Sequence, residues 1–472
     1  MARVDPTEAG TPRNFAALKA EIIDTGLCTR CGGCIGVCPD DALEIGDVLG
    51  DCLPQQKGDC NDCGLCHTAC SGGEVIFPQL NEQVFGHQPE NMLLGQYENI
   101  FVGHASEGGV RSQGASGGVV TAVLCDLLTK GEVDGAIVLG MDETGPWKSE
   151  VRIARTPSEV QAAAQSKYSL SPVNTIFREL EDLPGRFAYV GLPCQVHSLR
   201  KLQAAGHPAA NKITHVIGSY CGTILQFDAV RSFLRNNGVR DIEQVADLQY
   251  RAGEWPGQMQ VTLKNGEVIA LKKFYANYLI PFFMVDRCKL CTDLANEFAD
   301  IACGDAWAPV YEERGLGWSL VMGRTKRGAA LLDSMAAEGK LTLQPLEEES
   351  AVSMHSHMLD FKKRGAFLRM ERRAKRGQPV PEYGFKPNDI PRERRIFEAV
   401  LGAIFWLCSL SIARWLVEHF PVRITGQLFE QARLTWKRFT RTTKRKGLGY
   451  ASFRITDKGD ISKGDISKGD LS

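Results

Sequence analysis

Several features that would direct the search elsewhere are missing from this 472-residue chain. Neither charge sign dominates, since 55 basic residues face 56 acidic ones, so there is no global bias toward nucleic acid. Residues 1–10 are polar and contain no apolar signal segment, so we expect neither secretion nor a disulfide framework. No Gly-x-Gly-x-x-Gly fingerprint is present, which argues against direct use of a nicotinamide cofactor. No nucleophile or acid–base constellation is recognisable either.

Cysteine, in contrast, is abundant, with sixteen residues. Eight of them form two runs near the N-terminus, Cys28-x₂-Cys31-x₂-Cys34-x₃-Cys38 and Cys60-x₂-Cys63-x₂-Cys66-x₃-Cys70. This doubled spacing is typical of a bacterial-type ferredoxin, in which each run gives three thiolates to one [4Fe–4S] cluster and its fourth to the other. We therefore expect a first set of ligands, Cys28, Cys31, Cys34 and Cys70, and a second set, Cys60, Cys63, Cys66 and Cys38.

Other interpretations of the two runs fit less well. Structural zinc uses cysteine pairs separated by a longer spacer, not two runs of four.

Gly32, Gly33 and Gly64 suit loops whose backbone approaches the sulfurs closely. Ser71 follows Cys70 where this motif usually has proline, and because proline is not a ligand the change concerns the rigidity of the loop.

The rest of the chain divides by composition and periodicity. Short β-branched runs alternate with helical patterns over residues 106–345, which predicts an α/β domain with strands at 136–139, 187–190 and 213–217 and helices at 119–129 and 195–203. The expected order is a leader (1–20), an α+β ferredoxin-like module (21–80), a linker (81–105), the α/β domain (106–345), a basic connector (346–395), a helical appendage (396–446) and a disordered tail (447–472). The tail repeats Lys-Gly-Asp-Ile/Leu-Ser three times, with few core-forming residues.

The α/β domain carries a second group of candidate residues. The turn from Arg111 to Gly118, rich in glycine and serine, leads into a predicted helix, and such a turn either binds phosphate or simply caps the helix. Cys194 and Cys221 each follow a predicted strand, and Cys288-Lys-Leu-Cys291 supplies a further pair. Carboxyl ends of strands are where open α/β sheets place their sites. The four thiols either hold a third [4Fe–4S] cluster or are two buried cysteines plus a separate zinc or redox pair.

Residues 105–325 resemble the coenzyme F420 hydrogenase/dehydrogenase beta-subunit family. The stretches that carry the resemblance are Arg111–Gly118, Lys167-Tyr168, Gly191-Leu-Pro-Cys-Gln195, Tyr250-Arg251 with Trp255, Cys288–Asp293, Ala299-Asp-Ile301 and Gly304-Asp-Ala-Trp307. Members of this family often carry an N-terminal two-cluster ferredoxin module, as expected here. The resemblance implies an iron–sulfur protein that contains FAD.

The resemblance also implies roles for individual residues. It places FAD at Ser112, Gly114, Ser116, Gly117, Gly118, Lys167 and Tyr168. It makes Cys194, Cys221, Cys288 and Cys291 ligands of a third [4Fe–4S] cluster, with Cys303 a spare or substitute ligand. By the resemblance, the α/β domain is the flavin-binding part of the chain.

These expectations combine into an oxidoreductase. A flavin exchanges a hydride and releases electrons singly, so FAD beside a series of clusters would connect a hydride carrier, coenzyme F420 or a similar compound, to one-electron carriers. Two alternatives stay open: a ferredoxin-dependent reductase of an organic substrate, as in the chlorophyll-reductase relatives, or a non-catalytic electron-transfer subunit of a larger complex. The expected partners are therefore F420 or ferredoxin and a partner oxidoreductase subunit, without nucleic acid.

The appendage gives a further choice. Residues 399–413 carry no charge but are too few to span a bilayer, and residues 431–446 contain seven Lys or Arg and no acid. We favour packing on the core or on a partner subunit, with peripheral contact to an anionic membrane as the alternative. Reduced thiols and clusters indicate the cytoplasm, with membrane association if the alternative holds.

Overall fold

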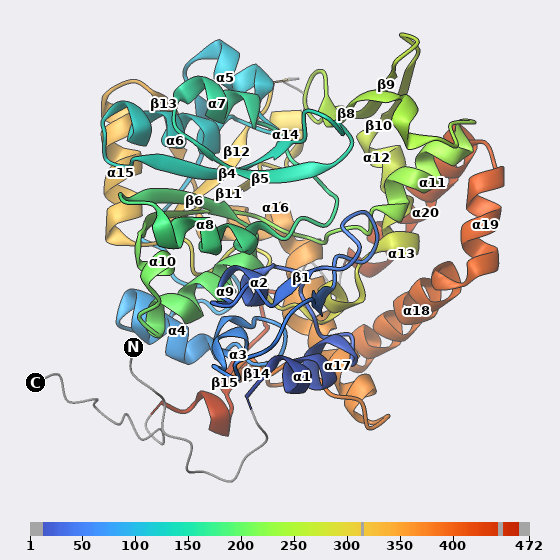
Figure 1. The fold of residues 1–472 in the computed structure, drawn as a ribbon. Helices are drawn as coiled ribbons and strands as arrows, with labels where there is room; N and C mark the ends of the chain where they lie inside the picture. The colour runs from blue at the N-terminus through green and yellow to red at the C-terminus, as the bar shows by residue number, and fades with distance from the viewer. Residues whose placement is uncertain (1–12, 313–315, 442–446, 462–472) are drawn as a thin grey trace, which may run out of the picture.

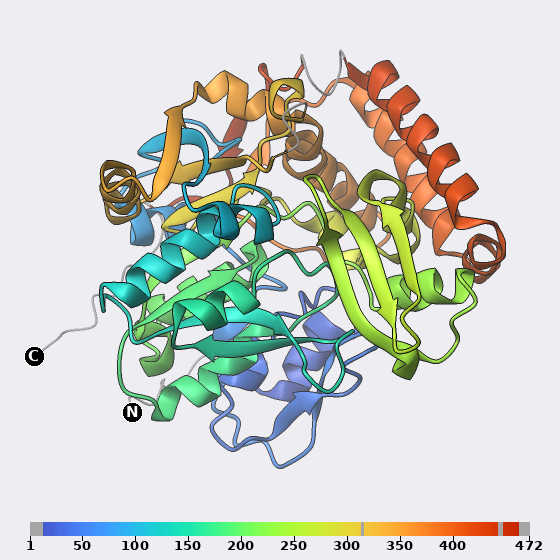
Figure 2. The same ribbon diagram turned by 90° about the horizontal axis from the view of Figure 1, so that it is seen from above.

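The structure, a computed structural model, describes residues 13–312, 316–441 and 447–461. A central mixed sheet is flanked by the N-terminal cysteine-rich part, by a smaller antiparallel sheet and by C-terminal helices (Figure 1). Seen from above, the smaller sheet and the C-terminal helices lie on the same side of the molecule (Figure 2). The expectation of an N-terminal iron–sulfur region, a mixed α/β body and terminal helices is thus confirmed at this level.

The central sheet has the strand order β13-β3-β12-β11-β7-β6-β4-β5. Its strands are β3 (Asn99–Ala105), β4 (Gly135–Met141), β5 (Ser149–Ala154), β6 (Phe187–Gly191), β7 (Ile213–Ser219), β11 (Ile301–Asp305), β12 (Ser319–Gly323) and β13 (Leu341–Pro345). The inner strands β4, β6, β7 and β11 are parallel, and the strands on both flanks are antiparallel. All three predicted strands are present, whereas β3 lies within the predicted linker.

Helices cover both faces of this sheet. They are α5 (Gly108–Gln113), α6 (Val119–Thr129), α7 (Pro157–Ala162), the 3₁₀ turn η2 (Val173–Ile176), α8 (Phe177–Asp182), α9 (Pro193–Ala204), α10 (Pro208–Asn211), α14 (Pro309–Glu312) and α15 (Lys326–Ala337). Alternate strand residues point to opposite faces. On one face they pack with Val123 of α6 and Leu332 of α15, and on the other with Leu199 of α9 and Phe177 of α8. Both predicted helices are confirmed.

The N-terminal part contains short elements. They are α1 (Phe15–Leu18), the π-helix η1 (Lys19–Ile23), α2 (Gly33–Gly36), β1 (Leu43–Ile45), β2 (Pro54–Gln56), α3 (Leu65–Ala69) and α4 (Phe77–Phe85). Part of the predicted leader is ordered, because Asn14 caps α1 and Phe15 and Leu18 are buried among the cysteine loops. Residues 1–12 of that leader lie outside the described residues.

A smaller sheet with its own core stands beside the central one. Its elements are α11 (Asp228–Asn236), the 3₁₀ turn η3 (Ile242–Gln244), β8 (Val245–Ala252), β9 (Gln258–Leu263), β10 (Val268–Lys272), α12 (Lys273–Ala276), α13 (Leu279–Phe283) and the 3₁₀ turn η4 (Asp286–Leu290). The strand order is β10-β9-β8, antiparallel throughout. Tyr250 and Phe233 belong to its apolar core. The predicted α/β domain therefore contains two sheets.

The C-terminal third corrects two expectations. Its elements are α16 (Glu348–Asp360), the π-helix η5 (Phe361–Gly365), α17 (Ala366–Ala374), β14 (Phe385–Pro387), α18 (Arg392–Ser409), α19 (Ser411–His419), α20 (Val422–Arg441), β15 (Phe453–Ile455) and the 3₁₀ turn η7 (Asp457–Gly459). Part of the basic connector lies in the core, because carboxylates and cysteine sulfurs inside the protein surround Lys362, Lys363 and Arg394, whereas Lys375 and Arg376 are exposed. Residues 447–461 of the predicted disordered tail are ordered, since β15 pairs with β14 and Leu448 is buried. Residues 462–472 lie outside the described residues.

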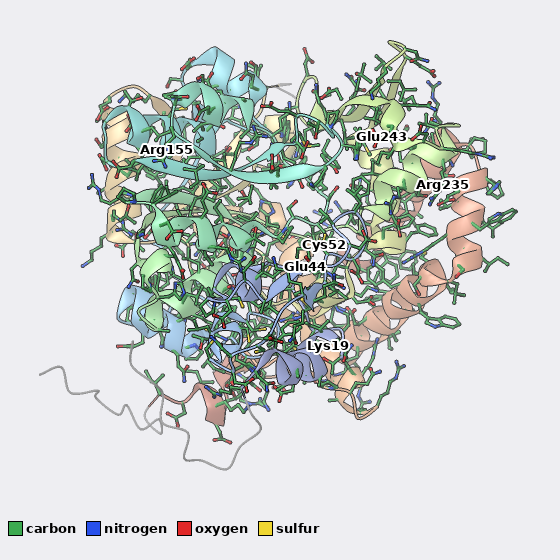
Figure 3. All side chains as sticks on the ribbon, in the orientation of Figure 1. Lys19, Glu44, Cys52, Arg155, Arg235 and Glu243 are labelled. Atoms are coloured by element: carbon green, nitrogen blue, oxygen red, sulfur yellow. The ribbon has the colours of Figure 1, made fainter. Side chains whose placement is uncertain are left out.

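One face of the appendage packs on the body. Arg235 of α11, labelled in Figure 3, pairs with Glu418 of α19 at 2.6 Å, and Val417 joins the core of the smaller sheet. Trp406 and Trp415 lie exposed on the outer face. In the described part of the chain no single helix is long and apolar enough to cross a membrane; α18 and α19 reach that length together but are bent by 73°.

Candidate functional site

The two cysteine runs form loops of the same backbone shape. Arg30 and Asp62 occupy equivalent places before the second cysteine of each run and have φ of 60° and 57°. Gly32 and Gly64 follow that cysteine with φ of 86° and 76°. Left-handed backbone at a non-glycine residue is uncommon, so its recurrence at matched positions marks a repeated, specifically shaped loop. Both loops then begin a short helix, α2 or α3.

The thiols of the first set lie together. Burial raises the pKa of Cys34, and the neighbouring thiols of Cys28, Cys31 and Cys70 raise it further. Backbone N–H groups of Gly33 and Gly72 donate to the sulfurs of Cys31 and Cys70 at 3.5 and 3.3 Å. Cys70 thus lies near the thiols of the first run, and its role as a ligand there stays a prediction.

Ser71, which replaces the usual proline, contacts this set directly. It is buried, it shares a hydrogen bond of 2.9 Å with the Thr29 hydroxyl, and its own hydroxyl donates to the Cys31 sulfur at 3.7 Å. Serine at this position therefore adds a hydrogen-bond donor to the Cys31 sulfur, a predicted cluster ligand.

The second set lies nearer the surface. Burial raises the pKa of Cys66 to about 12, and the neighbouring thiols of Cys63 and Cys60 raise it further. Cys63 is exposed. Cys38 is half-buried, and its carbonyl accepts from Arg178 at 3.3 Å. Across the described ranges, no three His, Cys, Asp or Glu side chains are close enough to hold a single metal ion.

The first cysteine loop is fitted tightly onto the α/β body. The buried Asn174 of η2 donates its backbone N–H to the Cys31 carbonyl at 2.8 Å and its side-chain amide to the Gln195 carbonyl at 3.0 Å. Gly36 of α2 leaves no room for a Cβ, which would collide with the Asn174 carbonyl. One residue thus connects the first cysteine loop to the residue that follows Cys194.

The structure brings together the four candidate thiols of the body. Cys194 begins α9 after β6, Cys221 follows the adjacent parallel strand β7, and Cys288 and Cys291 come from η4 and the residue after it. Burial raises the pKa of Cys194, which the neighbouring thiols of Cys221, Cys31, Cys291 and Cys288 raise further. We call Cys194, Cys221, Cys288 and Cys291 the third set.

Four half-buried thiols from three loops suit an iron–sulfur cluster in number and donor type. Burial raises the pKa of Cys221 to about 12, so without metal its thiol keeps its proton. Iron would supply the positive charge that stabilises the thiolate form. The presence of Cys31 among the neighbours of Cys194 sets this group beside the first set.

The other cysteines have different surroundings. Cys303 on β11 is buried, packs in an apolar core cluster near Tyr220 and borders the same cavity as Cys194 and Cys221, which Cys408 of α18 also lines. Cys52, labelled in Figure 3, donates to the Val48 carbonyl at 3.1 Å and packs with Leu170. Cys125 on α6 is half-buried.

A cavity of about 2090 Å³ extends from the glycine- and serine-rich turn to the third set and the C-terminal helices. Predicted flavin-site residues on its wall are Gly114, Ser116, Gly118, Lys167 and Tyr168. Cys194 and Cys221 also line it, and Phe405 and Leu416 of the appendage close the far side. Pockets for small ligands usually measure about 300–1,000 Å³, so this cavity has room for more than one molecule.

Two predicted flavin-site residues do not reach the cavity wall. Ser112, at the end of the short helix α5, is exposed and donates to the Gly109 carbonyl at 3.0 Å. Gly117 is buried, and its N–H donates to the Ser319 hydroxyl at 2.9 Å. Gly118 caps α6 with φ of 73°, and the first turn of that helix lines the cavity. The turn therefore presents the N-terminus of α6, where phosphate groups bind.

The side chains of Lys167 and Tyr168 form hydrogen bonds with different segments. The Lys167 ammonium donates to the carbonyls of Ala163 and Ala164 at 2.6 and 2.7 Å, and burial, with a smaller effect of Arg152, lowers its pKa to about 7. The Tyr168 hydroxyl accepts from Arg251 at 3.2 Å.

Asp305 organises the neighbouring wall of the cavity. Its carboxylate binds the buried Arg251 guanidinium at 2.9 Å and the Trp255 indole N–H at 2.9 Å. Trp255 stacks on Trp307 with 5.0 Å between ring centroids. His355 donates from Nε2 to the Asp305 carbonyl at 2.9 Å, and burial lowers its pKa to about 4, so this imidazole is neutral.

Sequence reasoning missed Asn174, His355 and Lys362, which approach the cysteine sets or the cavity from distant segments. None lies in a motif. For Lys362 the available signal was its place among three consecutive cations, which we interpreted as part of a basic connector.

Comparison with known proteins agrees with this geometry. Residues 21–44 match the 4Fe-4S binding domain, a match that ends before the second cysteine run. Residues 100–178 match the N-terminal part of the coenzyme F420 hydrogenase/dehydrogenase beta subunit, and residues 185–349 match the C-terminal part of the same subunit. These matches identify a protein of the oxidoreductase class with an iron–sulfur domain.

The chain belongs to the coenzyme F420 hydrogenase/dehydrogenase beta-subunit family and carries an N-terminal 4Fe–4S binding domain. It is 29% identical over 345 residues to the coenzyme F420-dependent sulfite reductase of Methanocaldococcus jannaschii, covering 70% of this chain but about half, 49%, of that relative. It is 26% identical to the coenzyme F420 hydrogenase subunit beta of Methanothermobacter thermautotrophicus (61% of this chain, 100% of the relative). It is 27% identical to one subunit of the F(420)H(2) dehydrogenase of Methanosarcina mazei (73% and 92%).

A solved structure has the same fold over part of the chain. A chain of the F420-reducing [NiFe] hydrogenase complex from Methanosarcina barkeri matches with a TM-score of 0.50 and 21% identity. The match covers 62% of this chain and 98% of that one. At this identity the likeness concerns the fold.

Proposed function

We propose that this protein passes electrons between a hydride carrier, coenzyme F420 or a similar compound, at FAD and one-electron carriers through three [4Fe–4S] clusters. The observation that carries the proposal is continuity. One cavity touches both the α6 turn and the third set, and Cys194 of that set neighbours Cys31 of the first set. Each cofactor site thus adjoins the next.

FAD, when bound, exchanges two electrons with a hydride carrier and single electrons with a cluster. For its phosphates the chain offers the N-terminus of α6 with Gly118 at the cap, where free N–H groups and the helix dipole favour anions. Lys167 borders the same space, and its ammonium is fixed by backbone carbonyls. Ser112 and Gly117 would then shape the turn without contacting the flavin.

The cysteine sets would define the direction of transfer. Cys194 and Cys221 of the third set line the cavity. Cys31 of the first set neighbours Cys194, and the second set includes the exposed Cys63. A one-electron partner, a ferredoxin or a partner oxidoreductase subunit, would meet the chain at the second set. Relatives named as hydrogenase and dehydrogenase subunits support such an assembly.

The size of the cavity favours a second candidate, a ferredoxin-dependent reductase of an organic substrate. A space of about 2090 Å³ leaves room beside a flavin for a second bound molecule. In such a reductase, electrons would enter at the second set and leave at the cavity. An electron-transfer subunit without its own substrate would not need that room.

The outer face of the appendage is a further candidate for contact. Its exposed side chains that do not line the cavity include Trp406, Trp415 and Phe439. Peripheral binding to an anionic membrane predicts sedimentation of the protein with phosphatidylglycerol vesicles but not with phosphatidylcholine vesicles. Failure to sediment with either would leave a partner subunit as the occupant of this face.

Anaerobic reconstitution tests the proposal. We expect about twelve irons and one flavin per chain, and rapid bleaching of flavin and cluster absorbance by reduced F420. Bleaching by reduced ferredoxin but not by F420 would favour the substrate reductase. About four irons and no flavin would contradict both functions.

Two matched cysteine variants locate the third cluster. C194S should lose about four irons and keep the two ferredoxin-type clusters, whereas C303S should keep all three. Loss of iron from C303S instead would make Cys303 a ligand.

A further inference from the structure

Three consecutive cations, Lys362, Lys363 and Arg364, lie in the π-helix η5, and all are at most 1% exposed. Successive helical side chains point about 100° apart, so burial of all three means that protein surrounds the helix. Lys363 pairs with Glu297 at 2.6 Å, and Arg364 donates to Asp360 at 2.7 Å. Within the described residues, Lys362 forms no ion pair with a carboxylate.

The surroundings of Lys362 are cysteine sulfurs. Its ammonium donates a hydrogen bond to the Cys291 sulfur and also neighbours Cys221 and Cys288. A buried cation without a carboxylate partner is costly unless other negative charge is present. A thiolate-bound cluster supplies such charge.

The segment that carries Lys362 packs directly on the loop of Cys288 and Cys291. Arg369 of α17 donates to the Lys289 carbonyl, and the Tyr383 hydroxyl donates to the Leu290 carbonyl at 2.9 Å. Phe361, the residue before Lys362, packs in the apolar cluster that includes Cys288. Both residues between the two cysteines are thus held from the C-terminal segment, beyond residue 349, where the family match ends.

We propose that Lys362 is a positioning residue of the third cluster, whose ammonium donates to the Cys291 sulfur and raises the reduction potential of that cluster. Reduction adds one electron, and a fixed cation at hydrogen-bond distance in a dry site stabilises the reduced form more than the oxidised form. The inference rests on the proposed function, because it requires a cluster on the third set. A higher reduction potential makes the third cluster a better acceptor of electrons from a flavin in the cavity.

Potentiometric titration of the full, reconstituted protein, followed by electron paramagnetic resonance, tests this. The variants are K362M, which removes charge and donor; K362Q, which keeps a donor; and K362R, which keeps the charge. K212M is the matched control, because the Lys212 ammonium binds the carbonyls of Leu180, Glu181 and Leu183 rather than cysteine. Iron is counted in every sample.

In K362M the ratio of reduced to oxidised third cluster at the wild-type midpoint should fall at least tenfold, a shift of about 59 mV to lower potential. In K362Q this ratio should fall less than in K362M, and in K362R and K212M it should equal the wild-type ratio. If K362M and K362Q assemble only the two ferredoxin-type clusters, restoration of the third by K362R also supports the inference.

An unchanged third-cluster potential in K362M or K362Q would overturn the inference, as would a lost cluster that K362R does not restore. Failure of the proposed function is distinguishable, because wild-type protein would then contain no third cluster by iron count and spectrum.

Discussion

Asp360 holds the C-terminal helices to the body through a buried ionic network. Its two carboxylate oxygens accept from Nε of Arg364 and Nε of Arg394, both at 2.7 Å, and Asp360 is fully buried. Arg394 also binds Glu398 at 2.8 Å, which in turn binds Arg369 at 2.6 Å. The network joins the end of α16, the start of α18 and α17 between them.

Substitution D360A should strongly destabilise this part of the protein. Removing one partner of a buried pair costs about 3–5 kcal/mol. Here two buried guanidiniums lose a carboxylate partner, and Arg394 keeps only Glu398, which it shares with Arg369. E371A is the matched control: Glu371 pairs with Arg395 at 2.7 Å, but both side chains are 46% exposed, so its loss should cost about 1 kcal/mol or less.

Urea unfolding of the reconstituted chain, followed by far-ultraviolet circular dichroism, measures the difference, because the segments that the network joins are helices. D360N should fall between the two variants, since an amide keeps one acceptor oxygen but no charge. A D360A midpoint indistinguishable from that of E371A would refute the reasoning that this network is a structural element.

Three further outcomes follow from the site. Burial lowers the pKa of His355 to about 4, so the stability that its neutral form contributes is complete above the unfolded pKa near 6.5 and is lost as pH falls toward 4. Between pH 6.5 and 5 the free energy of unfolding, measured with urea, should therefore drop by about 2 kcal/mol. In H355Q this loss should be absent. Removal of the hydrogen bond to the Cys31 sulfur in S71A should lower the midpoint of one ferredoxin-type cluster by about 40 mV, the equivalent of about 1 kcal/mol for one electron, and an unaltered titration would contradict that role. G36A should cost about 1–3 kcal/mol in thermal unfolding, because its Cβ would collide with the Asn174 carbonyl; wild-type stability would show that the loop can move away.

The local patterns predicted the parts of the fold that depend on neighbours in sequence. Cysteine spacing by itself forces three thiols around one loop, and the predicted strands and helices at residues 119–217 are confirmed because burial on the sheet follows periodicity. The family could be recognised from motifs for the same reason. The separate core of β8–β10 and the antiparallel flanks of the main sheet could not be predicted from local patterns, because strand pairing depends on contacts between residues far apart in the sequence.

The pattern of charges gave a wrong prediction where tertiary structure supplies partners for buried cations. Lys362, Lys363 and Arg364 look like a solvated connector in sequence, yet sulfurs and carboxylates from distant segments surround them. The tail around Leu448 is ordered because β14, more than sixty residues earlier, offers an unpaired edge. The sequence by itself determined which residues we expect to bear redox chemistry, since cluster ligation depends on residue type and spacing. Which cation faces which set of thiols was decided by the tertiary structure, since electrostatic effects depend on distance and burial, neither of which is local in sequence.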